Sequence, residues 1–208
     1  MRHKHNNQNN PMMEHYYSEI QKSPLIMKKI KERIGNFEFE FYTASGVFSK
    51  NKVDKGTLIL AKNMFIKKNS NVLDIGCGIG VLGIVAAKFF NANVVMSDIN
   101  KRAVALAKMN AKLNNVEAEI YQGNLYEPIK QADFDVVLLN PPQTAGKEIC
   151  FELIKKSKNY LKKDGSLQLV ARHNKGGKTL SNKMQEVFGN LNVLAKKAGY
   201  WVYMSIKD

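Results

Sequence analysis

Cysteine is scarce in this chain, since only Cys77 and Cys150 occur, too few for a disulfide framework and without the spacing of a metal site. The sequence also lacks any uninterrupted apolar run near the ~20 residues that span a bilayer. Its basic first residues are not followed by the apolar stretch and small-residue cleavage site of a secretory signal. Together these absences predict a cytoplasmic protein in a reducing compartment, without a metal site or a membrane anchor.

Acidic side chains are outnumbered as well. The 208 residues contain 18 Asp and Glu against 32 Lys and Arg, which leaves a formal net charge of +14. A positive field of this size attracts polyanions and raises their encounter rate, so nucleic acid is the favoured partner. Genomes rich in A and T raise the lysine content whatever the function, and the charge alone therefore does not decide between these explanations.

Composition divides the chain into three stretches. Residues 1–36 are polar, and we expect a partly disordered extension there. Residues 37–70 begin with phenylalanines that alternate with glutamates, the period-two pattern of a strand with one wet face, which predicts a β-rich lead-in. Residues 71–208 have the composition of a folded core, so we expect a single domain over residues 37–208.

Apolar strands alternate with amphipathic helices in this core. The expected strands are residues 71–75, 93–98, 118–122, 134–140 and 166–171, and the expected helices are about 81–90, 101–113, 147–161 and 178–188. Such βαβ order predicts a parallel sheet with right-handed crossovers and helices on both faces. The last residues differ, because "LNVLAKKAGYWVYMSI" reads as two strands around a tight turn, a terminal antiparallel hairpin.

The turn "VLDIGCGIGVLG" after the first core strand fits two cofactors. Gly78, Gly80 and Gly83 have the G-x-G-x-x-G order of a dinucleotide site, yet Asp74 and Gly76 complete the D-x-G-x-G-x-G order of a methyl-donor site. Glycines after a buried strand permit a sharp bend and a close approach of the ligand. A dinucleotide needs the helix N–H groups for its pyrophosphate, whereas S-adenosylmethionine has no phosphate and presents an amino group. A carboxylate at the strand end suits the second cofactor.

Asp98 ends the next strand, where its two oxygens could accept from both hydroxyls of a ribose. Both cofactors contain that ribose, so Asp98 does not discriminate between them.

The discriminating stretch is "FDVVLLNPPQTAGK", at the carboxyl end of the fourth strand, where open α/β sheets place their reactions. Pro141 and Pro142 have no N–H to donate and fix the backbone, so that carbonyl groups project beside the side-chain oxygen of Asn140. Such a cluster of acceptors suits a planar amine.

The two motifs in this order resemble class I S-adenosylmethionine-dependent amino methyltransferases, whose fourth strand ends in N-P-P-x. With "SGVFSKNKVDKGTLIL" and "SDINKRAVALAKMN", the chain resembles the "methyltransferase small" family from Phe37 to the C-terminus. Within it, the chain is similar to the small-subunit ribosomal RNA guanine-N2 methyltransferases and their single-domain archaeal relatives. The resemblance implies a Rossmann-like seven-stranded α/β sheet, S-adenosylmethionine as cofactor, and methylation of guanine in ribosomal RNA or a ribosomal subunit.

The resemblance also implies roles for individual residues. The cofactor would lie against Asp74, Gly76, Cys77, Gly78, Gly80, Asp98, Ile99, Asn124, Leu125 and Asn140. The target amine would be held by the catalytic group Asn140, Pro141 and Pro142. The RNA substrate would meet Phe48, Asp54, Thr57, Gln143, Lys147, Arg172, Lys175 and Lys178.

Three features depart from the family pattern. Asn124 stands where Asp is common beside the adenine, and it keeps an acceptor without the charge. Gln143 replaces the aromatic residue that stacks on the acceptor in adenine and glutamine methyltransferases, which makes those substrates less fitting. Bacterial rRNA methyltransferases of this kind also carry a second, degenerate domain for which this chain has no room.

Alternatives stay open at this point. A protein glutamine methyltransferase shares N-P-P and would not need the positive charge, and a non-catalytic RNA-binding module could keep the fold. Cys77 is expected to serve as a small residue in its turn rather than as a nucleophile, and His3, His5 and His15 as solvated groups. The basic stretch "RHNKGGK" is either an RNA contact or an ordinary loop.

Overall fold

The computed structural model describes residues 17–21, 23–49 and 51–208. The three N-terminal histidines, and residues 1–16 and 22 of the extension predicted over residues 1–36, lie outside the described residues. None of the helices in the described ranges is long and apolar enough to cross a membrane.

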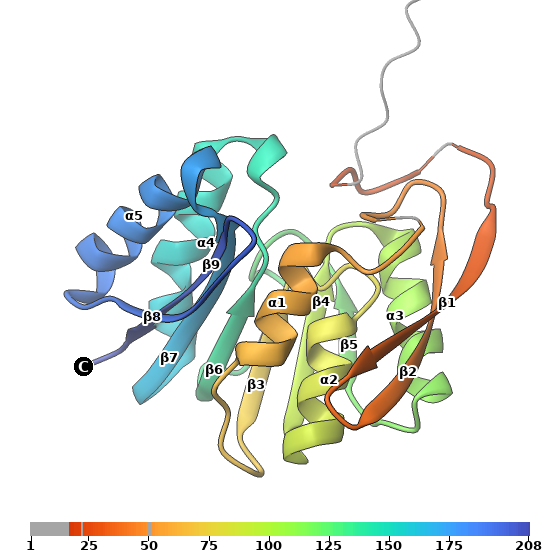
Figure 1. Ribbon diagram of the computed structural model, residues 1–208, viewed down its shortest axis with the longest axis horizontal. Helices are drawn as coiled ribbons and strands as arrows, with labels where there is room; N and C mark the ends of the chain where they lie inside the picture. Colours follow the sequence, from red (N-terminus) through yellow and green to blue (C-terminus); the bar gives the residue numbers. More distant parts are fainter. Residues whose placement is uncertain (1–16, 22, 50) are drawn as a thin grey trace, which may run out of the picture.

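A seven-stranded sheet forms the core, with the strand order β5-β4-β3-β6-β7-β9-β8 (Figure 1). Five strands are parallel: β3 (Asn71–Ile75), β4 (Asn93–Asp98), β5 (Glu119–Gln122), β6 (Phe134–Leu139) and β7 (Leu161–Arg172). The last two form the antiparallel hairpin β8 (Asn192–Lys197) and β9 (Tyr200–Ile206), and β9 pairs antiparallel with β7. The predicted sheet and terminal hairpin are therefore confirmed.

Helices cover both faces of this sheet. One face carries α1 (Lys55–Asn63), α2 (Val81–Phe90) and α3 (Lys101–Leu113), and the other carries α4 (Lys147–Tyr160) and α5 (Lys178–Phe188). Two short turns follow the carboxyl ends of strands: η1 (Gln143–Ala145) comes after β6 and η2 (His173–Gly177) comes after β7. Each face buries its own apolar cluster, so the sheet is covered on both sides as a parallel sheet requires.

The glycine turn between β3 and α2 depends on backbone that other residues rarely adopt. Gly76, Gly78 and Gly80 have φ values of 68°, 56° and 87°, in the left-handed region that favours glycine. Gly83 has a different cause, since a Cβ there would lie 2.6 Å from Sδ of Met96. The first three glycines permit the tight turn between β3 and α2, and the fourth lets α2 pack closely on β4.

An antiparallel hairpin of β1 (Met27–Ile34) and β2 (Phe37–Ala44) precedes the sheet and packs on α3. Asn110 of α3 accepts from the Tyr42 N–H over 2.6 Å and donates to its carbonyl over 3.0 Å. Asn114 holds Glu40 in the same two-way manner, over 3.2 Å and 2.7 Å. These two side-chain amides connect β2 to α3 by hydrogen bonds. They thereby fix the position of the segment that follows β2, which covers the cavity described below.

Two elements that precede the seven-stranded sheet differ from expectation. Strand β1 begins at Met27, ten residues before residue 37, where we expected the domain to begin. Helix α1 was not predicted at all, although Asp54 caps it by accepting from the N–H of Thr57 over 3.0 Å. This helix brings two predicted substrate residues to the mouth of the cavity.

Candidate active site

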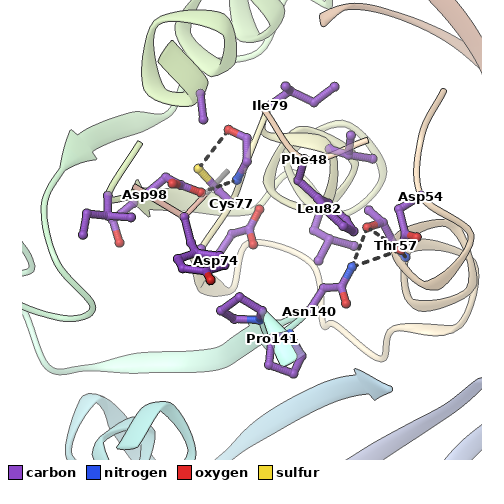
Figure 2. Close-up of a pocket in the computed structure, with 18 of the residues that line it drawn as sticks. Phe48, Asp54, Thr57, Asp74, Cys77, Ile79, Leu82, Asp98, Asn140 and Pro141 are labelled. Atoms are coloured by element: carbon purple, nitrogen blue, oxygen red, sulfur yellow. Dashed lines mark hydrogen bonds between the residues drawn. The ribbon is translucent and has the colours of Figure 1, made fainter. Parts of the chain in front are cut away.

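A cavity lies at the carboxyl ends of β3, β4 and β6, beneath the segment that joins β2 to α1 (Figure 2). Fourteen of the residues proposed from the sequence line it: Phe48, Asp54, Thr57, Asp74, Gly76, Cys77, Gly78, Asp98, Ile99, Asn124, Leu125, Asn140, Pro141 and Pro142. The structure therefore brings the two motifs, which are more than 50 positions apart in sequence, to one cavity.

Asn140 follows β6, and its side chain is held by the start of α1. Its Nδ2 donates to Thr57 Oγ1 over 2.8 Å and to Asp54 Oδ2 over 3.2 Å (Figure 2). A carboxylate only accepts hydrogen bonds, so the amide NH₂ must face Asp54 and the amide oxygen must face the other way. Asn140 thus offers an acceptor whose orientation is fixed before any ligand arrives.

Pro141 and Pro142 form a tight turn beside this amide. The Pro141 carbonyl accepts from the N–H of Gln143, and the Pro142 carbonyl accepts from the N–H of Ala145, both over 2.8 Å. One lone pair of each carbonyl is therefore already used, which the sequence did not reveal. The Asn140 side-chain oxygen is left as the principal acceptor at this point of the wall.

Asp98 is held by backbone donors from two directions. Its Oδ2 accepts from Gly78 and its Oδ1 from Asn100, both over 2.8 Å. A carboxylate has about four lone-pair sites, so each oxygen can still accept from a ribose hydroxyl. Burial raises the pKa of this carboxyl, and the two N–H donors counteract that rise. The arrangement fixes Asp98 in the orientation that a ribose diol needs.

Asp74 is almost fully buried at the end of β3, with an exposed fraction of 1%. Its Oδ2 accepts from the N–H of Gly83 over 2.9 Å. Burial raises the pKa of this carboxyl from 3.8 to about 7, and the charge of Asp98 adds to the rise. A cation bound beside Asp74 would therefore be strongly favoured, because it would relieve the cost of a buried carboxylate.

Cys77 lies between these two carboxyl groups. Burial raises the pKa of its thiol well above the ordinary value, and the charges of Asp74 and Asp98 raise it further. A thiol is nucleophilic only as the thiolate, so this environment opposes a covalent role.

Several predicted site residues lie outside the cavity wall. Gly80 is the N-cap residue of α2, and Lys147 is the exposed first residue of α4. Arg172 ends β7, Lys175 lies in η2 and Lys178 begins α5, all away from the lining. Gln143 is also outside, but its Nε2 donates to the Lys175 carbonyl over 3.0 Å and ties the proline turn to the basic loop.

Sequence reasoning missed part of the lining. The cavity wall also includes Tyr17, Ser49, Lys52, Val53, Ile79, Val81, Leu82, Ser97, Ala103, Gly123, Ala145, Ile149 and Leu153. Val81, Leu82 and Ile149 come from the first turns of α2 and α4, which the glycine and proline motifs could have indicated by their position. Tyr17 had no signal in the sequence, because only the course of the chain brings it to this mouth.

The donor set suits S-adenosylmethionine better than a dinucleotide. The buried Asp74 and the half-buried Asp98 face a cavity that would otherwise have to accommodate a pyrophosphate, and like charges in a poorly solvated site repel. The methyl donor instead brings a cationic sulfur and an ammonium group. Gly76 and Gly78 also leave open space where a side chain would stand, since a Cβ at either position would meet no atom within 4 Å.

Comparisons with known proteins agree with this geometry. The model of a family described as the methyltransferase small domain matches residues 38–204. YbxB of Bacillus subtilis, named as an uncharacterized protein, is 35% identical over 200 residues, which cover 94% of this chain and 100% of that protein. A putative protein N5-glutamine methyltransferase of Methanocaldococcus jannaschii is 34% identical over 160 residues, 67% of this chain and 81% of that protein.

A solved structure extends the similarity. The 16S rRNA N2 methyltransferase RsmC of T. thermophilus, in complex with AdoMet and guanosine, aligns with a TM-score of 0.78 and 25% identity. The alignment covers 89% of this chain and 52% of that chain. The chain also matches bacterial ribosomal RNA small subunit methyltransferases C, of which it likewise spans about half the length.

Proposed function

The chain belongs to the methyltransferase small domain family, and from this premise we propose that it methylates the exocyclic amine of a base in RNA, namely N2 of guanine in small-subunit ribosomal RNA. The coarser activity, methyl transfer from S-adenosylmethionine, is that of the family. The proposal includes the site residues, the division into a lead-in (37–70) and a catalytic core (71–208), and a place of action in the cytoplasm.

The observation that carries the proposal is the fixed amide of Asn140. Its NH₂ is bound to Thr57 and Asp54, so its oxygen is presented to the cavity that also contains Asp74 and Asp98. A planar amine is a donor of two hydrogens and needs such an acceptor. A dehydrogenase would have no use for this acceptor at the carboxyl end of β6.

The residues of this chain act by position and electrostatics. S-adenosylmethionine, when bound, supplies a methyl group on a positively charged sulfur. The lone pair of a guanine amine is delocalised into the ring, so the nitrogen must rehybridise before it can attack. Asn140 Oδ1 would accept one N–H of the amine, orient the lone pair, and stabilise the positive charge that develops on the nitrogen. The released proton would pass to water, and no titrating base is required.

Phe48 and the basic loop would bind the rest of the substrate. Phe48 lines the cavity at its mouth and is 38% exposed, which leaves it accessible for stacking on a planar base. Arg172, Lys175 and Lys178 are exposed between the end of β7 and the start of α5, and Gln143 links Lys175 to the proline turn. These cations would contact phosphates on one side of the target nucleotide.

A protein glutamine methyltransferase is the second candidate, because the Methanocaldococcus jannaschii relative carries that name. The side-chain amide of a substrate glutamine also presents a planar NH₂ group that Asn140 could hold. The net charge of +14 favours RNA over this alternative. A non-catalytic RNA-binding module is less fitting, since nothing in RNA binding alone would require the fixed amide and the carboxyl groups of Asp74 and Asp98 in the cavity.

One experiment separates these candidates. The protein is incubated with S-adenosylmethionine labelled in its methyl group and with separated RNA and protein fractions of cells. Label in RNA that digests to N2-methylguanosine supports the proposal. Label in protein that is released as N5-methylglutamine by enzymatic digestion supports the second candidate. Label in neither fraction, with intact cofactor binding, would support the non-catalytic module.

A further inference from the structure

The end of β7 and the turn of the β8–β9 hairpin lie together at one end of the sheet (Figure 1). Two rows of aromatic and basic side chains cross this end. Side chains at directly paired positions of neighbouring strands point to the same face. Each row has one aromatic ring on β9, a basic residue at or directly after the end of β7, and a lysine at the end of β8. We call these six residues the hairpin tip: Arg172, His173, Lys196, Lys197, Tyr200 and Trp201.

The first row lies on the face of the sheet that α1 covers. Tyr200 pairs with Arg172 on one side and with Lys197 on the other. The Arg172 guanidinium lies 5.5 Å from the centre of the Tyr200 ring. The same ring packs against Gly56, where an added Cβ would lie 3.0 Å from a ring carbon. Gly56 is two residues from Asp54, so this row adjoins the group that holds Asn140.

The second row lies on the opposite face. The His173 ring stacks on Trp201 with centroids 3.7 Å apart and an interplanar angle of 9°. Lys196, the partner of Trp201 in the β8–β9 ladder, has its Nζ 4.1 Å from the centre of the indole ring. His173 Nδ1 also lies 2.7 Å from the Tyr203 hydroxyl, which fixes the imidazole. The indole is thus flanked by two basic groups.

The charge of this tip is not balanced nearby in the sequence. Between Gly165 and Lys207 the one carboxylate is Glu186, and it pairs with Lys183 on α5. The tip cations Arg172, Lys196 and Lys197 are all exposed. Strand β8 runs parallel to β7, so both strands deliver their cations to the edge of the sheet where the cavity opens.

We propose that the hairpin tip binds the single-stranded RNA segment next to the target nucleotide, with Arg172, Lys196 and Lys197 at phosphates and the rings of Tyr200 and Trp201 beside bases. This inference rests on the proposed function and extends it to a surface outside the cavity. Cationic grooves with interleaved aromatic rings are the usual way in which proteins bind single strands. An acidic peptide would use the cations but would have no need of the two rings.

Trp201 provides a built-in probe, because it is the only tryptophan in the sequence. A 12-nucleotide single-stranded oligoribonucleotide containing one guanine is titrated into the whole protein while the indole emission is recorded. RNA at the tip should displace Lys196 from the ring and change the emission in a saturable way. Poly-glutamate of equal charge should change it only weakly. An equal response to poly-glutamate, or none to RNA, would overturn the proposal.

Charge-matched variants test the phosphate contacts. Lys196→Ser with Lys197→Ser removes two cations from the tip, and Lys67→Ser with Lys68→Ser removes two exposed neighbouring lysines before β3, at the opposite edge of the sheet. The affinity for the oligoribonucleotide is measured by anisotropy over a range of salt concentrations. Each lost phosphate contact should flatten the salt slope by about 0.7, so the tip variant should lose up to about 1.4 and the control almost nothing.

Failure of this surface and failure of the proposed function give different results. Equal slopes for both variants, with label still transferred to RNA, would show that the hairpin tip does not bind RNA and would leave the proposed function standing. Label transferred only to protein would contradict both the RNA contact of the hairpin tip and the proposed function. Calorimetry with S-adenosylmethionine is the check on folding, and its affinity should be the same for both variants and the wild type.

Discussion

The Nδ2 of Asn140 lies 2.8 Å from Oγ1 of Thr57, although the two residues are 83 positions apart in the sequence. Thr57 Oγ1 in turn lies 3.4 Å from Oδ2 of Asp54, which caps the same helix. The acceptor that we assign to catalysis is therefore oriented from α1, a helix that the sequence pattern did not predict. Changes in α1 should affect the rate of transfer without touching the cofactor.

The conservative pair Thr57→Val and Thr57→Ser tests this orientation. Valine has the shape of threonine but no hydroxyl, so Asn140 keeps only its longer bond to Asp54, and we expect kcat to fall about tenfold, the equivalent of one hydrogen bond. Serine keeps the hydroxyl and should retain nearly the full rate. Single-turnover transfer with saturating RNA measures both. Equal rates for the two variants would show that Thr57 serves only the fold.

Removal of the amide itself should have a larger effect. Asn140→Ala is expected to lower the transfer rate by about 10²–10³-fold, by analogy with the loss of one preorganised oxyanion-hole group. The affinity for S-adenosylmethionine should change little. Asn140→Asp is a sharper test, since it places a carboxyl group against Asp54 and should fare no better than alanine. A wild-type rate in Asn140→Ala would refute the proposed mechanism.

Asp98 should govern cofactor affinity. Asp98→Ala removes the charge-assisted hydrogen bonds to the ribose, which should cost roughly 1.5–3 kcal/mol, or about 10- to 150-fold in affinity. It also frees the N–H groups of Gly78 and Asn100, so Asp98→Asn, which keeps one acceptor oxygen, is the matched variant with an intermediate effect. Calorimetry measures both. Tight binding of NADH would contradict the cofactor assignment.

Binding of S-adenosylmethionine should depend on pH through Asp74. Burial raises its pKa to about 7 in the free protein, and a bound ammonium group would lower it again, so binding releases a proton below that pH. Affinity should therefore rise from about pH 5.5 to about pH 7, where the ammonium group stays charged, and then level off. Calorimetry in buffers of different ionisation enthalpy detects the proton. The Asp74→Asn variant should show no such rise.

The same carboxyl should limit the stability of the free protein. A raised pKa means that the folded state holds the proton of Asp74 more tightly than the unfolded state does. The free-energy cost of ionising Asp74 in the folded state is therefore absent below about pH 4, grows as the pH rises, and is complete above about pH 7. At about 1.4 kcal/mol per tenfold change, it amounts to about 4 kcal/mol. Asp74→Asn should thus have the higher free energy of unfolding at pH 7.5. Denaturant titrations should show this gap closing near pH 4.

Local pattern was sufficient for the βαβ core. The helices α2, α3 and α5 have the bounds that were predicted, because glycine or asparagine stands at the start of each and apolar positions repeat along one face. The glycine and proline motifs also placed the cavity, since they end neighbouring strands of one sheet. The seven-stranded sheet and its terminal hairpin followed from the same pattern together with the family resemblance.

The elements that precede the core sheet, β1 and α1, were not predicted, for two physical reasons. In β1 the apolar residues Ile30 and Ile34 are four positions apart, a helical spacing, and the strand exists through its pairing with β2. Helix α1 begins with "KGTLIL", in which a glycine and a short apolar run conceal the helical period. Asp54 three residues before Thr57 was the available signal, because aspartate in that position commonly caps a helix.

Both borders of the seven-stranded sheet have features that oppose self-assembly. β5 has only four residues, and β8 carries two lysines and a register shift between Val193 and Ala195. An uncovered border strand invites a second molecule to add its own strand, and shortness, lysine and local irregularity each oppose that addition. We therefore expect Lys196 and Lys197 to oppose the addition of a strand from a second copy at β8. The same two charges that we assign to RNA contact would then also protect an open border of the sheet.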